Sequence, residues 1–150
     1  PAGPLREPIS RIKEVDLTVV NGIPGRGEFE MKTVARYLYP LSGDAAPVAI
    51  ETLMGSKVHA VAGIGNPERF FDLLRIKGLR AEKHRFVDHH RFIPADFDFE
   101  DALPIIMTEK DAVKCEHFRL KDAWYLPIDI EMPEVFGHRL TSTLKEAVNG

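Results

Sequence analysis

The sequence of 150 residues has little of what marks secreted or membrane-spanning proteins. It contains one cysteine, Cys115, so neither an internal disulfide nor a cysteine-based zinc site can form, which fits a reducing cytosol. No uninterrupted apolar run reaches about 18 residues and no signal-peptide pattern opens the chain, so we expect no membrane-spanning segment in it. The net charge of -3 gives no general attraction for polyanions, and we expect no nucleic-acid partner.

A phosphate-binding loop of the form G-x-x-x-x-G-K-[ST] is also missing. The segment 22–27 has two glycines at the right spacing, but Glu28 and Phe29 stand where the lysine and the hydroxyl are required. A carboxylate at this place would repel a triphosphate. We therefore interpret the segment as a glycine-rich turn between strands.

The chain does not begin with methionine. It opens with PAGPLREP, which places three prolines in eight residues and has the composition of a loop. We expect either that an amino-terminal part has been removed or that the chain is the carboxyl part of a longer protein.

What the sequence does contain is a globular composition, with 44% apolar and 29% charged residues, and alternating strand and helix patterns. The clearest pattern lies between Lys57 and His90. A valine-rich run at 57–62 predicts a strand, Asn66 caps the helix that follows, and Gly78 ends this helix. Residues 80–87 predict a second strand.

The rest of the chain continues this alternation. We predict helices at 8–15, after Thr108 and at 133–148, and buried strands at 16–21, 104–107 and 123–128. Two short β runs at 29–31 and 34–39 could pair as a hairpin or ribbon. These elements predict an α/β fold with a mainly parallel sheet and helices on both faces, preceded by a short β-ribbon linker. A linker-like loop at 40–47 suggests a boundary near residue 45, between parts 1–45 and 46–150.

The glycine turn Gly63-Ile64-Gly65 begins like a dinucleotide-binding fingerprint, but Glu68 occupies the third glycine position. The backbone N–H groups at 65–69, with Arg69 nearby, could receive an anion at the start of the helix. An ordinary strand-to-helix turn explains the same residues equally well, so both interpretations stay open.

The run Asp88-His89-His90 places a carboxylate beside two imidazoles at the end of a predicted strand, where α/β sheets bind their ligands. Because alternate residues of an extended chain face opposite ways, we expect one imidazole to enter the site and the other to point away. Four acidic residues follow, but their spacing fits no metal site and we assign no metal ligand: Asp96, Asp98, Glu100 and Asp101. The other histidines are interpreted as structural: His59, His84, His117 and His138.

The run Thr108-Glu109-Lys110-Asp111 follows another predicted strand with a hydroxyl, two carboxylates and an amine. Lys110 is placed where it could bind phosphate. The alternative is a helix start, with a capping hydroxyl, acidic residues in the first turn and Lys110 in solvent.

Six motifs together resemble the tetraacyldisaccharide 4′-kinases of lipid A assembly. They are PAGPLREP (1–8), VVNG (19–22), AGIGNPERFF (62–71), FVDHH (86–90), MTEKDAVKC (107–115) and WYLPI (124–128). The resemblance implies a P-loop kinase at the cytoplasmic face of the bacterial inner membrane. Such an enzyme transfers the γ-phosphoryl group of Mg-ATP to the 4′-hydroxyl of a tetraacyl glucosamine disaccharide 1-phosphate.

The resemblance covers only the carboxyl half of that family, whose amino-terminal half carries the phosphate-binding loop and the catalytic aspartate. It implies that residues 1–45 complete the N-terminal kinase core and add the β-ribbon linker, and that 46–150 form the P-loop-kinase-associated C-terminal α/β domain. ATP and Mg2+ would be bound mainly by the missing half, and we expect the chain alone to be inactive. The implied partners are the lipid A disaccharide precursor, the inner-membrane surface as a peripheral contact, and the N-terminal kinase domain.

Carried over to this sequence, the resemblance implies that His89 is catalytic and pairs with the catalytic aspartate of the missing half. Arg6 and Glu7 would form an edge of the substrate or nucleotide site. Asp88, His90 and Lys110 are secondary candidates.

Two other classes of function stay open: a metal-dependent phosphohydrolase that uses Asp88, His89 and His90, and a non-catalytic α/β binding module. Five cations make the first 40 residues basic and suit either an anionic lipid surface or plain solvation: Arg11, Lys13, Arg26, Lys32 and Arg36.

Overall fold

A computed structural model describes residues 8–43 and 45–149. Arg6 and Glu7 lie outside the described residues. The chain divides into two compact units. Residues up to Val34, together with those from Asp129 onward, form the first unit, and Ala35–Ile128 form the second.

This division differs from the expected boundary near residue 45. The loop 40–47, which has the composition of a linker, lies inside the second unit between two of its strands. The final helix, which we expected in the carboxyl-terminal part, belongs to the first unit. The reason is that residues 32–34 pair with residues 129–131, and no local sequence pattern predicts this pairing.

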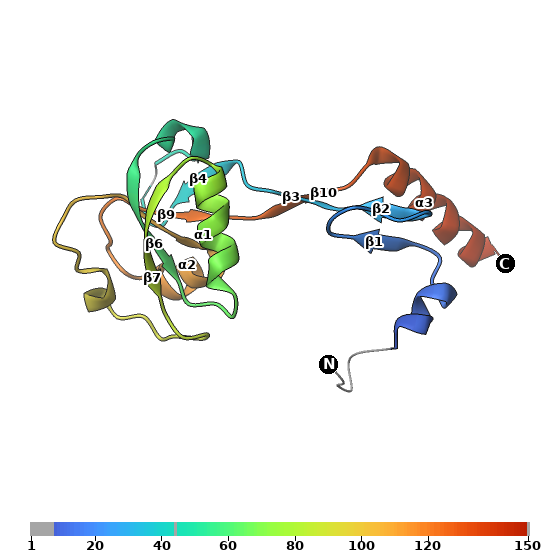
Figure 1. Cartoon of the computed structure of the whole chain (residues 1–150), viewed down its shortest axis with the longest axis horizontal. Helices are drawn as coiled ribbons and strands as arrows, with labels where there is room; N and C mark the ends of the chain where they lie inside the picture. Colours follow the sequence, from blue (N-terminus) through green and yellow to red (C-terminus); the bar gives the residue numbers. More distant parts are fainter. Residues whose placement is uncertain (1–7, 44, 150) are drawn as a thin grey trace. The chain divides into compact units, whose positions relative to one another are not determined.

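The second unit is built on a six-stranded sheet with the order β5-β4-β9-β8-β6-β7 (Figure 1). Strands β9, β8, β6 and β7 are parallel, and β4 and β5 add an antiparallel edge. The strands are β4 (Tyr37–Pro40), β5 (Val48–Ala49), β6 (Lys57–Ala62), β7 (Arg80–Arg85), β8 (Ile105–Thr108) and β9 (Ala123–Leu126). The predicted mainly parallel sheet is confirmed.

Helices cover both faces of this sheet, as predicted. Helix α1 (Pro67–Ile76) and the 3-10 helix η2 (Ile50–Leu53) pack on one face. Helix α2 (Glu109–Cys115) and the 3-10 helix η3 (Pro94–Phe97) pack on the other. Because side chains alternate along a strand, β6 sends its residues in turn to two separate apolar clusters, and the strand is buried from Val58 onward.

The β6-α1-β7 segment matches its prediction closely, because each of its signals is local. Phe71 and Leu74 are fully buried beneath α1, each stabilising the fold by about 1.5–3 kcal/mol. Asn66 takes the N-cap position, although its side chain makes no capping hydrogen bond. Gly78 has a φ of 83°, the left-handed conformation that ends the helix. Strand β7 ends at Arg85, slightly before the predicted end.

The first unit contains short strands and two helices: η1 (Ile9–Glu14), β1 (Thr18–Val20), β2 (Glu28–Glu30), β3 (Lys32–Val34), β10 (Asp129–Glu131) and α3 (Glu134–Asn149). Strands β1 and β2 form a parallel pair, and β3 and β10 form an antiparallel pair. The predicted terminal helices are both present.

Two predictions for this region are wrong. The β runs at 29–31 and 34–39 do not form a hairpin, since β2 pairs with β1, β3 pairs with β10, and β4 pairs with β9 and β5. The strand predicted as buried at 16–21 is only partly covered, and Val19 is 38% exposed. The β ribbon therefore exists, but its second strand comes from a distant part of the sequence.

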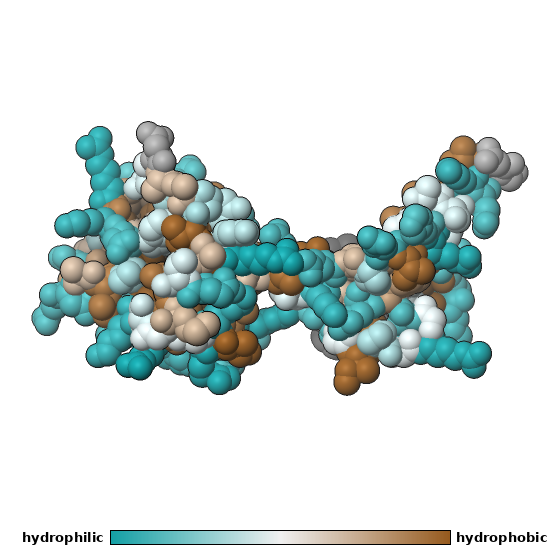
Figure 2. Space-filling view, turned by 90° about the horizontal axis from the view of Figure 1, so that it is seen from above, coloured by the Kyte–Doolittle hydropathy of each residue, from teal (hydrophilic) through white to brown (hydrophobic). Residues whose placement is uncertain are grey.

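Among the described residues, no helix combines the length and apolar character needed to cross a bilayer. The face drawn in Figure 2 is mostly hydrophilic, and its apolar residues form small separate groups. Some of the exposed apolar residues lie on α3, where Val135 and Leu144 are each more than half exposed. These apolar side chains of α3 thus have little cover within the described residues.

Candidate functional site

Three loops meet at the carboxyl ends of the parallel strands. They are the glycine turn after β6, the run that follows β7, and the start of α2 after β8. The Asp88 carboxylate lies beside Gly65, where an added Cβ would be 3.4 Å from Oδ2. Lys110 Nζ lies 3.5 Å from Asp88 Oδ1. Asp88 and Lys110, two of the candidates named from the sequence, therefore come together at the edge of the sheet where α/β proteins bind ligands.

His89 is the most exposed member of this group, with 78% of its side chain accessible. Its φ of 61° is left-handed, and its backbone N–H donates to Asp88 Oδ1 at 3.1 Å. The imidazole Nε2 lies 3.7 Å from Asp88 Oδ2. The turn thus holds an imidazole in solvent with a carboxylate behind it.

The pKa of Asp88 lies below its ordinary value. Desolvation acts to raise this pKa, but the positive charges of His89 and Lys110, with the hydrogen bonds from both residues, outweigh it. Asp88 is therefore ionised at neutral pH and counters the charge of Lys110.

His90 points away from this group. Its Nε2 is 2.9 Å from Asp96 Oδ2, and its ring packs against Phe86 and Phe92 with centroids 4.6 and 4.9 Å apart. The two imidazoles do face different surroundings, but not for the expected reason, because His89 stands in a turn with a φ of 61° and not in an extended strand. Because the two imidazoles and the Asp88 carboxylate do not converge, the phosphohydrolase interpretation loses its proposed metal ligands.

Asp111, which sequence reasoning did not single out, organises the glycine turn. Its buried carboxylate accepts hydrogen bonds from Gly63 N–H at 2.8 Å, Thr108 Oγ1–H at 2.7 Å and Lys114 Nζ at 2.7 Å. Thr108 Oγ1 in turn accepts from the Asp111 N–H at 3.2 Å, which confirms the predicted cap of α2. The only sequence signal was an acidic residue three positions after a capping threonine.

The same contacts make the first glycine of the turn structural. The Gly63 N–H is already bound to Asp111, and an added Cβ would lie 3.2 Å from Phe92 and 3.3 Å from Asp111. The Asp88 carboxylate lies beside Gly65. The anion interpretation concerns the start of α1, where Gly65, Asn66 and Arg69 line the cavity described next.

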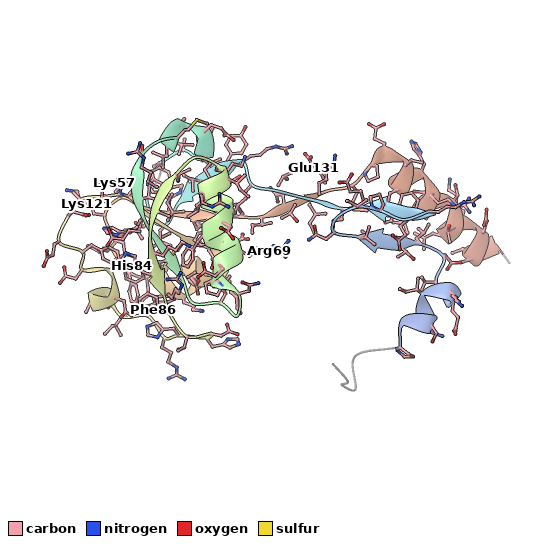
Figure 3. All side chains as sticks on the ribbon, viewed as in Figure 1. Lys57, Arg69, His84, Phe86, Lys121 and Glu131 are labelled. Carbon is pink, nitrogen blue, oxygen red and sulfur yellow. The ribbon has the colours of Figure 1, made fainter. Side chains whose placement is uncertain are left out.

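Next to this group lies an open cavity of about 400 Å3. Gly65, Asn66 and Arg69 from the start of α1, and Thr108, Glu109 and Lys110 from the start of α2, provide its polar wall. Its apolar wall consists of Ile64, Phe70, Leu126 and Ile128. Figure 3 labels Arg69 on α1. A ligand with an anionic group and an apolar part would match such a lining.

The glycine turn at 22–27, which has the glycine spacing of a phosphate-binding loop, lies in the first unit. Its Gly25 N–H donates to Glu28 Oε2 at 2.7 Å, so a carboxylate of the same turn takes up a group that a phosphate loop would offer to its ligand. Each of the two glycine turns therefore has one backbone N–H bound to a carboxylate of the chain itself.

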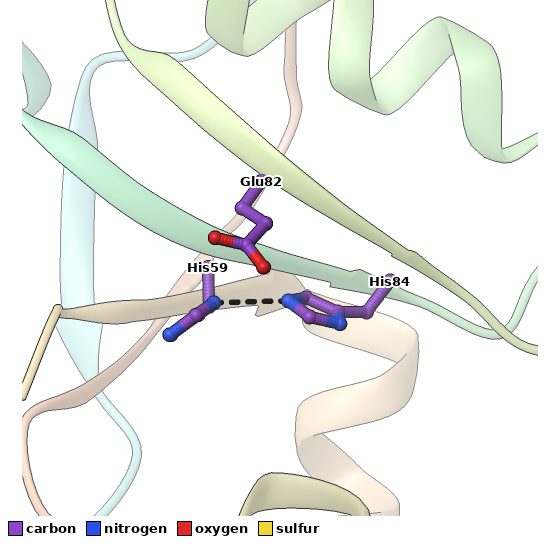
Figure 4. A group of neighbouring side chains, drawn as sticks. All are labelled: His59, Glu82 and His84. Carbon is purple, nitrogen blue, oxygen red and sulfur yellow. Dashed lines mark hydrogen bonds between the residues drawn. The ribbon is translucent and has the colours of Figure 1, made fainter. Parts of the chain in front are cut away.

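Two histidines interpreted as structural come together on β6 and β7. His59 Nδ1 lies 2.9 Å from His84 Nε2, and Glu82 lies beside both (Figure 4). The pKa of His84 is lowered, first by desolvation and then by the neighbouring His59. Sequence reasoning missed this pair because 25 residues separate the two histidines.

These features place the chain in the class of open α/β-sheet proteins whose ligand site lies at the carboxyl ends of the parallel strands. Comparison with known proteins gives the family. The family described as tetraacyldisaccharide-1-P 4′-kinase matches residues 1–145, and the chain belongs to it.

Curated relatives include the tetraacyldisaccharide 4′-kinases of Nitrosococcus oceani and Methylobacillus flagellatus. The first is 47% identical over 150 residues, which cover 98% of this chain and 43% of that protein. The second is 43% identical over 145 residues, which cover 96% and 43%. The chain thus spans less than half the length of these relatives.

A crystal structure of LpxK from Aquifex aeolicus, described as the "apo" form in complex with ATP, has the same fold. It superposes with a TM-score of 0.64 at 22% identity, covering 90% of this chain and 44% of that one. The resemblance seen in the sequence and the α/β fold are both confirmed.

Proposed function

We propose that this chain is the carboxyl-terminal part of a lipid A 4′-kinase, which transfers a phosphoryl group from ATP to the 4′-hydroxyl of a tetraacyl glucosamine disaccharide 1-phosphate. The observation that carries the proposal is the placement of His89, Asp88 and Lys110 near a partly apolar cavity, in a chain that belongs to this kinase family.

In this proposal His89 handles the proton of the attacking hydroxyl. An exposed neutral imidazole can accept a proton from a sugar hydroxyl that reaches it, and Asp88 at 3.7 Å stabilises the imidazolium that forms. Lys110, 3.5 Å from Asp88, is close enough to contribute positive charge for a phosphorylated ligand. The apolar wall of the cavity suits an acylated substrate.

ATP and Mg2+ belong to this proposal but not to these residues. Both glycine turns have backbone N–H groups bound to carboxylates, at Asp111 and Glu28. The nucleotide and its metal would therefore be held by the part of the kinase that this chain does not span. We infer that the chain alone is inactive, since phosphoryl transfer depends on holding the triphosphate in line with the acceptor.

The first unit supports the idea of an N-terminal partner domain. Two parallel strands alone make a weak sheet, and parallel sheets are normally covered on both faces. Several apolar side chains of this unit are exposed: Ile12, Val15, Val19, Ile130, Val135, Leu140 and Leu144. We propose that the N-terminal kinase domain covers them and extends the β1-β2 pair.

A peripheral position at the cytoplasmic face of the inner membrane is part of the proposal, because the substrate carries acyl chains. The basic first 40 residues support it only weakly, since Arg11 and Lys32 pair with Glu14 and Glu30. Flotation of the complete kinase with vesicles containing anionic lipid, compared with neutral vesicles, measures this contact. Equal binding to anionic and neutral vesicles would argue against an electrostatic contribution to membrane binding.

The main test replaces His89 in the complete kinase and measures transfer of labelled phosphate from ATP to the disaccharide. We expect His89→Ala to lower kcat by about 100-fold or more, as loss of a general base typically does, with little change in the KM for ATP. His117→Ala, which also removes an exposed imidazole, is the matched control. Unchanged turnover of His89→Ala would remove this residue from the mechanism. Phosphorylation by the 150-residue chain alone would refute its inactivity.

A further inference from the structure

The His59–His84 pair lies outside the candidate kinase site and has no part in the proposed reaction. It is created by strand register: His59 on β6 aligns with Glu82 on β7, and His84 follows two residues later on the same face of β7. Side chains 25 residues apart in sequence thus meet between two neighbouring parallel strands (Figure 4).

The three side chains have the donor atoms and the spacing of a metal site. One nitrogen from each imidazole and one oxygen of Glu82 all lie within 4.8 Å of one another. In a tetrahedral zinc site, ligand atoms at about 2.0–2.2 Å from the ion lie roughly 3.3–3.6 Å from one another. The two imidazole nitrogens, now 2.9 Å apart, have to separate slightly, and the Glu82 oxygen has to approach them. Glu82 is exposed and has a flexible side chain, so a small rotation closes the difference.

Asp101 holds His59 in the orientation that ligation requires. Its Oδ1 lies 2.8 Å from His59 Nε2 and also accepts the Leu103 N–H at 3.0 Å. With the Nε2 proton donated to this carboxylate, the lone pair of Nδ1 faces His84. A carboxylate behind a ligating histidine is the usual support of protein metal sites.

The surroundings fix the rings and leave one side open. Phe99 stacks on His59 with centroids 3.8 Å apart and lies 4.3 Å from the His84 ring. His59 is 3% exposed, whereas Glu82 is exposed and belongs to β7, an edge strand of the sheet. A metal ion therefore has a path from solvent to a preformed pair of imidazoles.

We propose that His59, Glu82 and His84 bind one divalent transition-metal ion of the zinc class, through His59 Nδ1, His84 Nε2 and the Glu82 carboxylate. Water completes the coordination. Imidazole ligands select such ions over Mg2+, which prefers oxygen, so this site is distinct from the Mg2+ of the kinase reaction. The bound ion ties the edge strand β7 to β6 and to the Asp101 loop, a structural role that needs no substrate.

The experiment is a calorimetric titration of the tag-free 150-residue chain, freed of metal by a chelator, with zinc chloride alone. We expect one zinc ion per chain. His84 binds the ion through Nε2, so the proton that this atom donates to His59 in the metal-free state moves to Nδ1 of the same ring, and the ring releases no net proton. Magnesium chloride should give no binding heat and should not compete.

Four variants separate the site from incidental zinc binding. His84→Gln and Glu82→Gln each remove a ligand, and Glu82→Gln changes an exposed side chain that the fold does not need. Asp101→Asn keeps all three ligands and should weaken zinc binding by about 10–100-fold. His117→Gln, the matched control, should bind as the parent chain does.

Cobalt gives a second readout that does not depend on heat. Co2+ bound to two imidazoles and a carboxylate should show the visible absorption of a low-coordinate site, and this absorption should vanish in His84→Gln while circular dichroism stays unchanged. Three results would each overturn the proposal. The parent chain does not bind zinc, or the zinc affinity stays unchanged in both His84→Gln and Glu82→Gln, or His117→Gln loses as much zinc affinity as these variants do. In these cases the pair is a hydrogen-bonded structural element only, and the proposed kinase function is unaffected.

Discussion

Replacing Asp111 with alanine removes the carboxylate on which the glycine turn, the cap of α2 and Lys114 all converge. The carboxylate is fully buried and accepts three hydrogen bonds, from the Gly63 N–H, the Thr108 hydroxyl and the Lys114 ammonium. Alanine leaves all three donors without this acceptor. The Lys114 side chain is 25% exposed and can reach water, but the Gly63 N–H and the Thr108 hydroxyl are held in the interior.

The size of the effect follows from these donors. Breaking a buried ion pair by removing one partner typically costs about 3–5 kcal/mol, and each buried donor left unsatisfied costs about 1–3 kcal/mol. Because the partly exposed Lys114 relaxes into solvent, we expect Asp111→Ala to lower the free energy of unfolding by about 3–5 kcal/mol. Small domains have about 5–15 kcal/mol in total, so the variant should be close to unfolding.

The measurement is urea unfolding of the second unit's tryptophan signal, since Trp124 lies on β9 of the same sheet. Asp111→Asn keeps the shape and the acceptor oxygen but loses the charge opposite Lys114. Its free energy of unfolding should lie between those of the parent chain and Asp111→Ala. Asp72→Ala is the control, because its exposed pair with Arg75 is worth at most about 1 kcal/mol. A loss below about 1 kcal/mol for Asp111→Ala would refute this account of the turn.

Three further predictions concern single groups. Gly78→Ala places a side chain at a φ of 83° and should lower the free energy of unfolding, measured in urea, by about 1–2 kcal/mol. Gly137→Ala in α3 has open space around the added Cβ and should raise it by about 0.5–1 kcal/mol. Burial, followed by the charge of Asp111, raises the pKa of Cys115 to about 12, so the native thiol should resist a disulfide reagent at neutral pH and react only after unfolding. The N–H of Ile93 and the imidazole of His90 outweigh desolvation and lower the pKa of Asp96. Because the unfolded chain binds protons more readily at this group, Asp96 stabilises the folded state above about pH 4. This contribution is lost as pH falls through the lowered pKa. In Asp96→Asn the free energy of unfolding should therefore depend less on pH in the acid range.

Sequence reasoning succeeded where the signals were local. The segment from β6 to β7 was recognised because the residues that start and stop its helix stand next to the residues they act on, as Gly78 shows with its left-handed φ. The pairing of β3 with β10 could not be read in this way, since Lys32 and Glu131 lie at opposite ends of the chain and any short β run fits either partner. The division of the chain into units follows from this pairing.

The residues of the candidate site also differ in whether a local sequence signal indicates them. Asp88, His89 and Lys110 were found because polar residues after a strand mark the ligand edge of an α/β sheet. Asp111 was missed, although it is adjacent to Lys110, because its importance comes from burial, and burial depends on how α2 packs on the sheet. His59 and His84 were missed because only the register of two parallel strands brings them together.

On the proposed function, the contacts of the site also explain why this chain alone should be inactive. In the second unit, Asp88 faces Lys110 and Asp111 binds Lys114, so the polar groups largely neutralise one another. His89 can exchange protons at its exposed position, but proton transfer alone does not activate a triphosphate. On the proposed function, this chain supplies the proton-handling side of the reaction and the absent half supplies the phosphoryl group. Loss of His89 should then slow a kinase that still binds ATP, whereas loss of the other half leaves nothing to transfer.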